Sequence, residues 1–245
     1  MPDRWILEPV MRCSLSAFSG LLTGRAPEVA EFLLDERNSS GEPEHQAISA
    51  ECEDFWSGVA AQLASASVYG FARFDGAGTA ELSAVVAIGA GRAVRVQAVD
   101  GVVTAEKIRH DAPWPALAGC LPPKRPAEGD AVTVPLDSVR QFATRPGTGG
   151  EGVGRAAQLL SRADDFTARL YTGLRRADGQ LRTADQHIEV HHAPTGRVAV
   201  IPQPADHCLV SPADLFVLAS ALQEQVEALW AADVERTQPI SAPGS

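Results

Sequence analysis

The sequence predicts an α+β fold built from a repeated unit, in which a helix, several antiparallel strands and a second helix follow one another. Two observations predict it. Apolar residues change from helical spacing to alternation at about residue 69, and again at about residue 167. Each series of strands then leads into a helix opened by a proline, at Pro113 and at Pro212. We therefore expect one antiparallel meander in each half of the 245-residue chain.

The first half begins with two predicted helices. A short strand at Trp5–Leu7 precedes a helix from Pro9 to Leu22, and the polar segment Asp35–Glu44 is a loop. The clearer helix runs from Ile48 to Leu63, where apolar residues recur at i, i+4, i+7, i+8, i+11 and i+15. This pattern gives one apolar stripe along the helix, which requires a partner layer.

Four strands follow, because the period of the apolar residues becomes two. Asp100-Gly101 lies between two alternating runs, which is a strong signal of a tight hairpin, so we predict an antiparallel meander. A short helix at Ala112–Leu121 closes the unit. The four strands are predicted at Tyr69–Phe74, Ala80–Ile88, Arg92–Val99 and Val102–Arg109.

The second half repeats this order after a connecting region. The glycine-rich segment 144–154 is interpreted as a flexible linker between an N-terminal half, 1–143, and a C-terminal half, 155–235; residues 236–245 are expected to be a disordered tail. Ser211 is the predicted N-cap of the last helix, with Pro212 at its first position. The other elements are a strand at Val132–Val134, helices at Pro135–Phe142 and Arg155–Ala163, and strands at Thr167–Arg175, His187–His192, Arg197–Ile201 and Cys208–Val210.

Composition excludes several classes of function. The formal net charge is −10 and the pI is about 5.0, which disfavours a surface that binds nucleic acid phosphates. No apolar run reaches the roughly 18 residues that a membrane helix needs. The N-terminus has no basic stretch followed by an apolar block, and the four cysteines form no CxxC motif. We therefore expect a cytoplasmic protein with reduced thiols and no membrane span.

An ordered set of segments resembles the EspG family, cytoplasmic chaperones of type VII (ESX) secretion systems. The set covers most of the chain, from about Trp5 to Leu229. Each segment alone is a weak signal, and their order carries the resemblance. The segments are Tyr69–Phe74, Ala84–Val94, Asp100–Thr104, Leu121–Pro123, Gly129–Pro135, Ala156–Leu160, Asp185–Val200 and Ser211–Asp214.

The resemblance implies a fold and an activity. The fold has two similar α+β halves that share a central antiparallel sheet with helices at the flanks. The activity is binding of a helical export substrate, a secreted protein or heterodimer of the PE/PPE type, with no cofactor and no catalysis. In family members the loop after the first strand of the meander approaches the substrate. The corresponding partner-binding residues here are Phe74, Asp75, Gly76, Gly78 and Thr79; the alternative is that the aromatic residues are core and the segment is only a turn.

A second hypothesis is a small enzyme or a ligand- or metal-binding protein that uses the histidine-rich strand 187–192. His187, His191, His192 and His207 occur within 21 residues, and Cys208 is adjacent. Alternation along a strand places His187, Glu189 and His191 on one face and His192 on the other. A structural zinc site needs four convergent ligands, so we expect no metal here and a polar strand face instead.

No other motif indicates catalysis. Gly147 to Gly152 satisfies GxGxxG, but a predicted helix rather than a strand precedes it, and no Lys-Ser/Thr follows. No serine lies in GxSxG, and no cysteine has a recognisable catalytic context. We therefore predict neither catalytic residues nor a cofactor. The oligomeric state stays open, including a homodimer formed through an exposed sheet edge.

Overall fold

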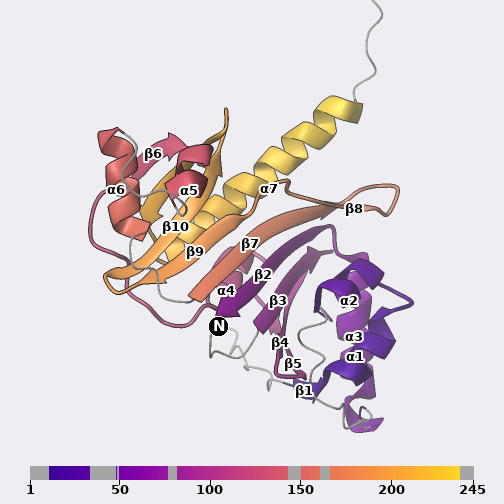
Figure 1. Cartoon of the computed structure of the whole chain (residues 1–245). Coiled ribbons are helices and arrows are strands. Elements are labelled where there is room, and N and C mark those ends of the chain that lie inside the picture. Colours follow the sequence, from indigo (N-terminus) through magenta and orange to yellow (C-terminus); the bar gives the residue numbers. More distant parts are fainter. Residues whose placement is uncertain are drawn as a thin grey trace, which may run out of the picture.

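The computed structural model describes residues 11–33, 48, 50–76, 82–142, 150–160 and 166–237. They form one antiparallel sheet of eleven strands, flanked by helices (Figure 1). The strand order is β1-β5-β4-β3-β2-β7-β9-β10-β11-β6, and β8 pairs with β7 outside this path. The predicted α+β class, with a shared central antiparallel sheet, is confirmed.

The elements have the following bounds. The strands are β1 Met11–Ser14, β2 Val68–Gly76, β3 Leu82–Gly89, β4 Arg92–Val99, β5 Val102–Ile108, β6 Val132–Pro135, β7 Phe166–Arg175, β8 Leu181–Thr183, β9 Ile188–Ala193, β10 Gly196–Gln203 and β11 His207–Pro212. The helices are α1 Leu15–Leu22, α2 Pro27–Leu33, α3 Ala50–Ser65, α4 Pro113–Ala118, α5 Leu136–Phe142, α6 Glu151–Leu160 and α7 Leu215–Thr237.

The chain repeats one topological unit. In the first half an outer strand (β1), helices ending in α3, the four strands β2–β5 and then α4 follow one another. In the second half β6, helices ending in α6, the strands β7, β9, β10 and β11, and then α7 follow in the same order. The two units join along β2 and β7, which pair antiparallel from Val68↔Leu174 to Gly76↔Phe166. The strand order on one side of this junction therefore mirrors the order on the other, which gives the sheet a quasi-twofold arrangement.

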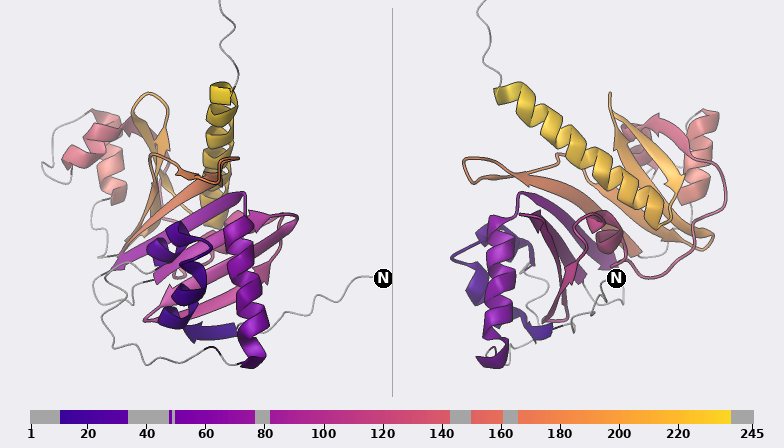
Figure 2. Two further views of the ribbon diagram at one scale, coloured as in Figure 1. Left: turned by 90° about the vertical axis from the view of Figure 1, so that its right-hand side faces the viewer. Right: turned by 180° about the vertical axis from the view of Figure 1, so that it is seen from behind.

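Helices cover the two faces of the sheet unequally. On one face α4 and α7 pack over the centre, and Figure 2 shows them crossing the sheet when it is seen from behind. On the other face α1–α3 cover the strands of the first half, and α6 covers β6, β10 and β11 of the second. Three apolar clusters result, one for each covered area. Between the last two clusters, parts of β7 and β9 lie without a helix over them (Figure 1), whereas Phe71 of β2 and Tyr171 of β7 pack against the cluster of α1–α3.

The turns follow their sequence signals. Asp100 and Gly101 both have positive φ, at 47° and 75°, so the predicted Asp-Gly hairpin between β4 and β5 is confirmed. Ala90 and Gly91 form a similar turn between β3 and β4, with φ of 50° and 71°. The backbone twist of both turns matches the right-handed twist of the flanking strands, which keeps β3, β4 and β5 in register.

Three expectations about element boundaries are wrong. Within the predicted helix Pro9–Leu22, Met11–Ser14 forms a strand that pairs with Val102–Ala105 of β5, and Ser14 then caps α1. Helix α6 begins at Glu151, inside the predicted linker. Ser211 and Pro212 end β11, and α7 begins only at Leu215. In each case tertiary pairing or capping overrides the local pattern.

Two short elements, α2 and β8, were not predicted. The predicted strand at Trp5–Leu7, the predicted loop Asp35–Glu44 and residues 143–149 and 238–245 lie outside the described residues. The division of the chain at 144–154 stays a prediction. In the sheet, β6 pairs with β11, so residues 132–135 lie beside the second half.

The described residues contain no helix that is both long and apolar enough to span a membrane. The four cysteines are free thiols, and Cys208 is the buried one among them.

Candidate functional site

The open part of the sheet is a polar strip at the junction of the two halves. We call it the central strip; its residues are Arg73, Arg169, Tyr171, His187, Glu189 and His191. Cross-strand register puts them on one face, because Arg73 lies opposite Arg169 and Arg169 lies opposite Glu189. Arg169 is exposed, and the side chains of His187 and Glu189 are 40% exposed. The strip is therefore accessible, unlike the parts of the same face beneath the helices.

Glu189 is the electrostatic centre of the strip. Its Oε1 lies 3.1 Å from Nε2 of His187, and its Oε2 lies 3.4 Å from Nε2 of His191. The hydrogen bond with His191, followed by that with His187, lowers the pKa of Glu189 from 4.5 to about 2, against the effect of partial burial. Glu189 is therefore ionised at neutral pH, and it aligns both imidazoles along the strand.

This arrangement does not form a metal site. His187 and His191 are four residues apart, which is about 13 Å along an extended backbone, and each imidazole meets a different oxygen of Glu189. His192 points to the opposite face, as predicted, and stacks on Phe166 with ring centroids 4.1 Å apart. Among the residues that the structure describes, no three His, Cys, Asp or Glu side chains are placed to hold a metal ion.

An aromatic cluster closes one side of the strip. Phe71 stacks on Tyr171 at 5.0 Å, and Phe32 of α2 contacts both rings edge-on. Arg73 lies over the Phe32 ring, 4.9 Å from its centroid, and its Nη2 donates a hydrogen bond to the Phe32 carbonyl oxygen at 2.9 Å. The guanidinium of Arg73 is therefore held at the boundary between α2 and the open strip.

The predicted partner-binding residues lie at the end of β2 that borders this strip. Phe74 is 3% exposed and stacks on Phe166 at 5.8 Å, on the face covered by α7, so its side chain belongs to the core. Asp75 and Gly76 are the last residues of β2 and pair with Thr167 and Phe166 of β7. Gly78 and Thr79 lie outside the described residues. That this segment binds a partner stays a prediction.

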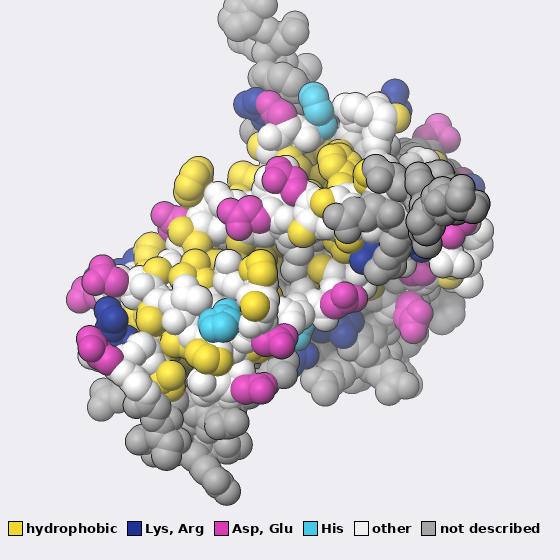
Figure 3. Space-filling view, turned by 90° about the horizontal axis from the view of Figure 1, so that it is seen from above, with side chains coloured by type: hydrophobic (Ala, Val, Ile, Leu, Met, Phe, Trp, Pro, Cys, Tyr) yellow, Lys and Arg dark blue, Asp and Glu magenta, His cyan; other side chains and the backbone are white. Residues whose placement is uncertain are grey.

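Two features of the surface were not predicted from the sequence. The first is the pair of arginines Arg73 and Arg169, whose signal was the alternation of charged with apolar residues in β2 and β7. The second is the exposed apolar side of α7, where Phe216 is 78% exposed, Trp230 53% and Val234 57%. Trp230 and Val234 follow Phe216 by 14 and 18 residues, so a helix with 3.6 residues per turn places all three on one side. Seen from above, the surface shows hydrophobic side chains gathered among Asp and Glu side chains (Figure 3).

The glycine motif does not form a nucleotide site in the described part of the chain. Gly152 lies in the first turn of α6, and its Cβ position would face Val132 and Val134 of β6. A dinucleotide fingerprint requires a strand directly before the glycines, but here the helix α5 precedes them.

Comparison with solved structures finds a similar fold. The structure of the Mycobacterium tuberculosis type VII secretion system chaperone EspG5, in complex with the PE25-PPE41 dimer, matches with a TM-score of 0.60 at 15% sequence identity. The match covers 89% of this chain and 96% of EspG5. A search of curated proteins finds no match. The model of the EspG family matches residues 46–224, which is most of the sheet and both halves of the repeat, and the chain belongs to the EspG family.

Proposed function

We propose that this protein is a cytoplasmic chaperone of a type VII secretion system that binds a helical export substrate of the PE/PPE type and keeps it soluble for secretion. The observation that carries the proposal is membership of the EspG family over residues 46–224. The fold of EspG5, a chaperone solved with a PE25-PPE41 dimer, supports it. The proposed role is binding rather than catalysis, and it needs no cofactor.

We propose that the substrate contacts the central strip together with the neighbouring end of β2. The strip offers both signs of charge, from Arg73 and Arg169 on one side and Glu189 on the other, so it can pair with polar side chains of a helical partner. Within the segment that we predict from sequence, Asp75, Gly76, Gly78 and Thr79 are the proposed contacts. Phe74 would act by anchoring the strand end in the core.

The exposed apolar side of α7 is an alternative contact surface. Phe216, Trp230 and Val234 are large hydrophobic residues that remain exposed, and such residues mark interaction sites when they share one face. Substitutions on each surface therefore decide which one the substrate uses.

The experiment is co-purification from the source cells. A tagged copy of the full chain is isolated under mild conditions, and bound proteins are identified by mass spectrometry. We expect one helical export protein, or a pair of them, in near-equal amount with the bait. Recovery of the chain alone, or of proteins that are not exported, would contradict the proposal.

Matched variants then locate the surface. Arg169→Glu, in the central strip, is expected to weaken binding of the recovered partner at least tenfold, because a charge reversal at the centre of an interface adds repulsion. Arg92→Glu makes the same change at the exposed first residue of β4 and serves as the control. Trp230→Ala tests α7. Loss of binding with Trp230→Ala and retention with Arg169→Glu would move the site to α7.

A further inference from the structure

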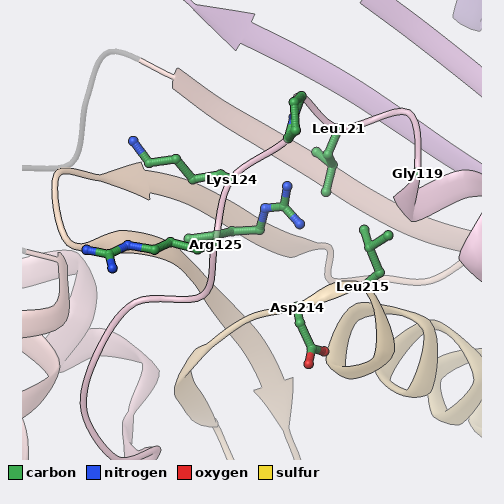
Figure 4. A pocket seen from close by; sticks show the side chains of 8 residues that line it. Gly119, Leu121, Lys124, Arg125, Asp214 and Leu215 are labelled. Atoms are coloured by element: carbon green, nitrogen blue, oxygen red, sulfur yellow. The ribbon is translucent and has the colours of Figure 1, made fainter.

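A pocket of about 640 Å³ lies where the connector after α4 passes the start of α7. Its walls come from three separate parts of the chain. Gly119, Leu121, Pro123, Lys124 and Arg125 belong to the connector; Arg197 is in β10; Asp214 and Leu215 are at the start of α7 (Figure 4). The pocket is on the side of the molecule that carries α4 and α7, apart from the central strip.

The backbone fixes Arg197 in this pocket. Its N–H donates to the carbonyl oxygen of Arg125 at 2.7 Å, and its carbonyl oxygen accepts from the N–H groups of Ala127 and Ala213, both at 3.0 Å. The preceding residue, Gly196, has φ of 141°, and a Cβ there would lie 2.4 Å from the carbonyl oxygen of Pro126. The connector, β10 and the segment before α7 are therefore clamped together around one residue.

The Arg197 side chain has unused hydrogen-bonding capacity. It is 2% exposed, and Nη2 donates to the carbonyl oxygen of Pro122 at 2.7 Å. Its Nε has no acceptor within the described part of the chain. Burial lowers the pKa of Arg197, and the nearby carboxylate of Asp214 partly opposes this shift. A buried guanidinium donor without an acceptor is costly, so the site favours an added anion.

Asp214 does not supply the missing acceptor. Its Oδ1 accepts a hydrogen bond from the N–H of Val217 at 2.8 Å, which caps α7. Three cationic side chains and this one carboxylate line the pocket, in a chain whose formal net charge is −10. Local positive charge against such a background attracts anions.

The apolar part of the wall indicates the kind of anion. Leu121 and Leu215 lie on the same side of the pocket, while Lys124 and Arg125 extend from the connector on the other side, with their charged ends directed away from the two leucines (Figure 4). Guanidinium groups pair well with both carboxylate and phosphate. A phosphate ion, however, has no apolar part that could pack against the two leucines. A carboxylate on a short apolar stem fits both walls.

We propose that this pocket binds a carboxylate carried on a short apolar stem, with Arg197 as its main donor, Lys124 and Arg125 as supporting charges, and Leu121 and Leu215 around the stem. The ligand is either a free small acid or the C-terminal carboxylate of a peptide. This inference does not depend on the proposed chaperone role.

The test uses the full chain and isovalerate as the probe, monitored by chemical shifts of backbone amides at constant ionic strength. We expect saturable shifts at Arg125, Arg197 and Leu215 with isovalerate, and none with the neutral isostere isovaleramide at the same concentrations. A response to isovaleramide equal to that of isovalerate, the absence of saturation, or tighter binding of inorganic phosphate would overturn the proposal.

Variants assign the roles. Arg197→Gln is expected to abolish binding, with circular dichroism as the check on folding. If that variant does not fold, two others decide. Lys124→Gln with Arg125→Gln should weaken binding at least threefold, and Asp214→Asn, which keeps a capping side chain, should strengthen it by a similar factor. The same loss from Arg92→Gln with Arg155→Gln, two arginines outside the pocket, would contradict a local site.

A last comparison distinguishes the two sources. Acetyl-Ala-Ala-Leu with a free carboxylate is compared with its C-terminal amide and with isovalerate. Binding of the peptide acid tenfold tighter than isovalerate, with none for the amide, assigns the pocket to a peptide C-terminus. Binding of isovalerate at equal or higher affinity assigns it to a small free acid. Failure of both acids to bind would refute the carboxylate site.

Discussion

Phe71 and Tyr171 stack face to face across the strands that join the two halves of the sheet, with ring centroids 5.0 Å apart and planes inclined by 20°. They are direct register partners on β2 and β7, so the contact is a cross-strand pair at the quasi-twofold junction. Phe71 also stacks on Tyr69, at 6.0 Å, and Phe32 meets it edge-on. One ring therefore links both halves of the repeat with α2.

Replacement of Phe71 tests this junction. Phe71 is 2% exposed, so Phe71→Ala leaves a cavity and is expected to lower the free energy of unfolding by about 3 to 5 kcal/mol. Phe216→Ala makes the same chemical change at a side chain that is 78% exposed, and it should cost less than about 0.5 kcal/mol. Urea denaturation measures both. Equal losses would mean that Phe71 does not hold the halves together.

Gly196 is the second structural test, because the connector passes directly over it. A Cβ at this residue would lie 2.4 Å from the Pro126 oxygen and 2.5 Å from the Ala127 nitrogen, and φ is 141°. Gly196→Ala is therefore expected to destabilise the protein by about 2 kcal/mol or more. The matched control is Gly154→Ala in α6, where a Cβ meets nothing within 4 Å and helix propensity should add about 0.5 to 1 kcal/mol. The midpoint temperature of thermal unfolding should fall for Gly196→Ala and rise for Gly154→Ala.

Much of the fold could be predicted from sequence because local signals and tertiary pairing agree. Arg92–Val99 alternates apolar with polar residues between two glycine-containing turns, and the structure has that strand with identical bounds. The repeat was predictable for the same reason, because apolar residues change from helical spacing to alternation in the same order in each half. Met11–Ser14 was not predictable, because its apolar spacing suits a helix and only pairing with β5 makes it a strand.

The site could be predicted only in part. Alternation of side chains placed His187, Glu189 and His191 on one face, as found. The arginines opposite them come from strands far apart in sequence, so their proximity depends on the register between β2, β7 and β9. The pocket around Arg197 likewise needs three distant segments to meet, and no single stretch of sequence signals it.

Asp214 provides a test of where α7 begins. Its carboxylate accepts from the Val217 N–H, whereas the hydroxyl of Ser211, the cap predicted from sequence, donates to the carbonyl oxygen of Pro212. Asp214→Ala should therefore lower stability by about 1 kcal/mol and speed hydrogen exchange of the Val217 amide. Asp214→Asn should retain most of the protection. If Ser211→Ala, and not Asp214→Ala, increased exchange at Val217, the helix would begin where the sequence pattern suggested.

The lowered pKa of Glu189 predicts how the stability of the folded protein depends on pH. Its pKa is lowered from 4.5 to about 2 in the folded protein, so the folded state binds the proton less readily than the unfolded chain does. The stabilising contribution is complete above about pH 4.5 and disappears as the pH falls through about 2. Because the side chain is 40% exposed, we expect less than about 1 kcal/mol after solvent screening.

Glu189→Gln isolates this contribution, because the amide cannot ionise but keeps the size of the side chain. The difference in free energy of unfolding between the original protein and Glu189→Gln should be fully present at about pH 4.5 and shrink toward zero as the pH falls through about 2. Glu224→Gln, at an exposed position of α7, is the control and should show no such trend. Urea titrations across this pH range measure both. A difference in free energy of unfolding that persists unchanged at pH 2 would mean that the two histidines do not stabilise the ionised carboxylate of Glu189.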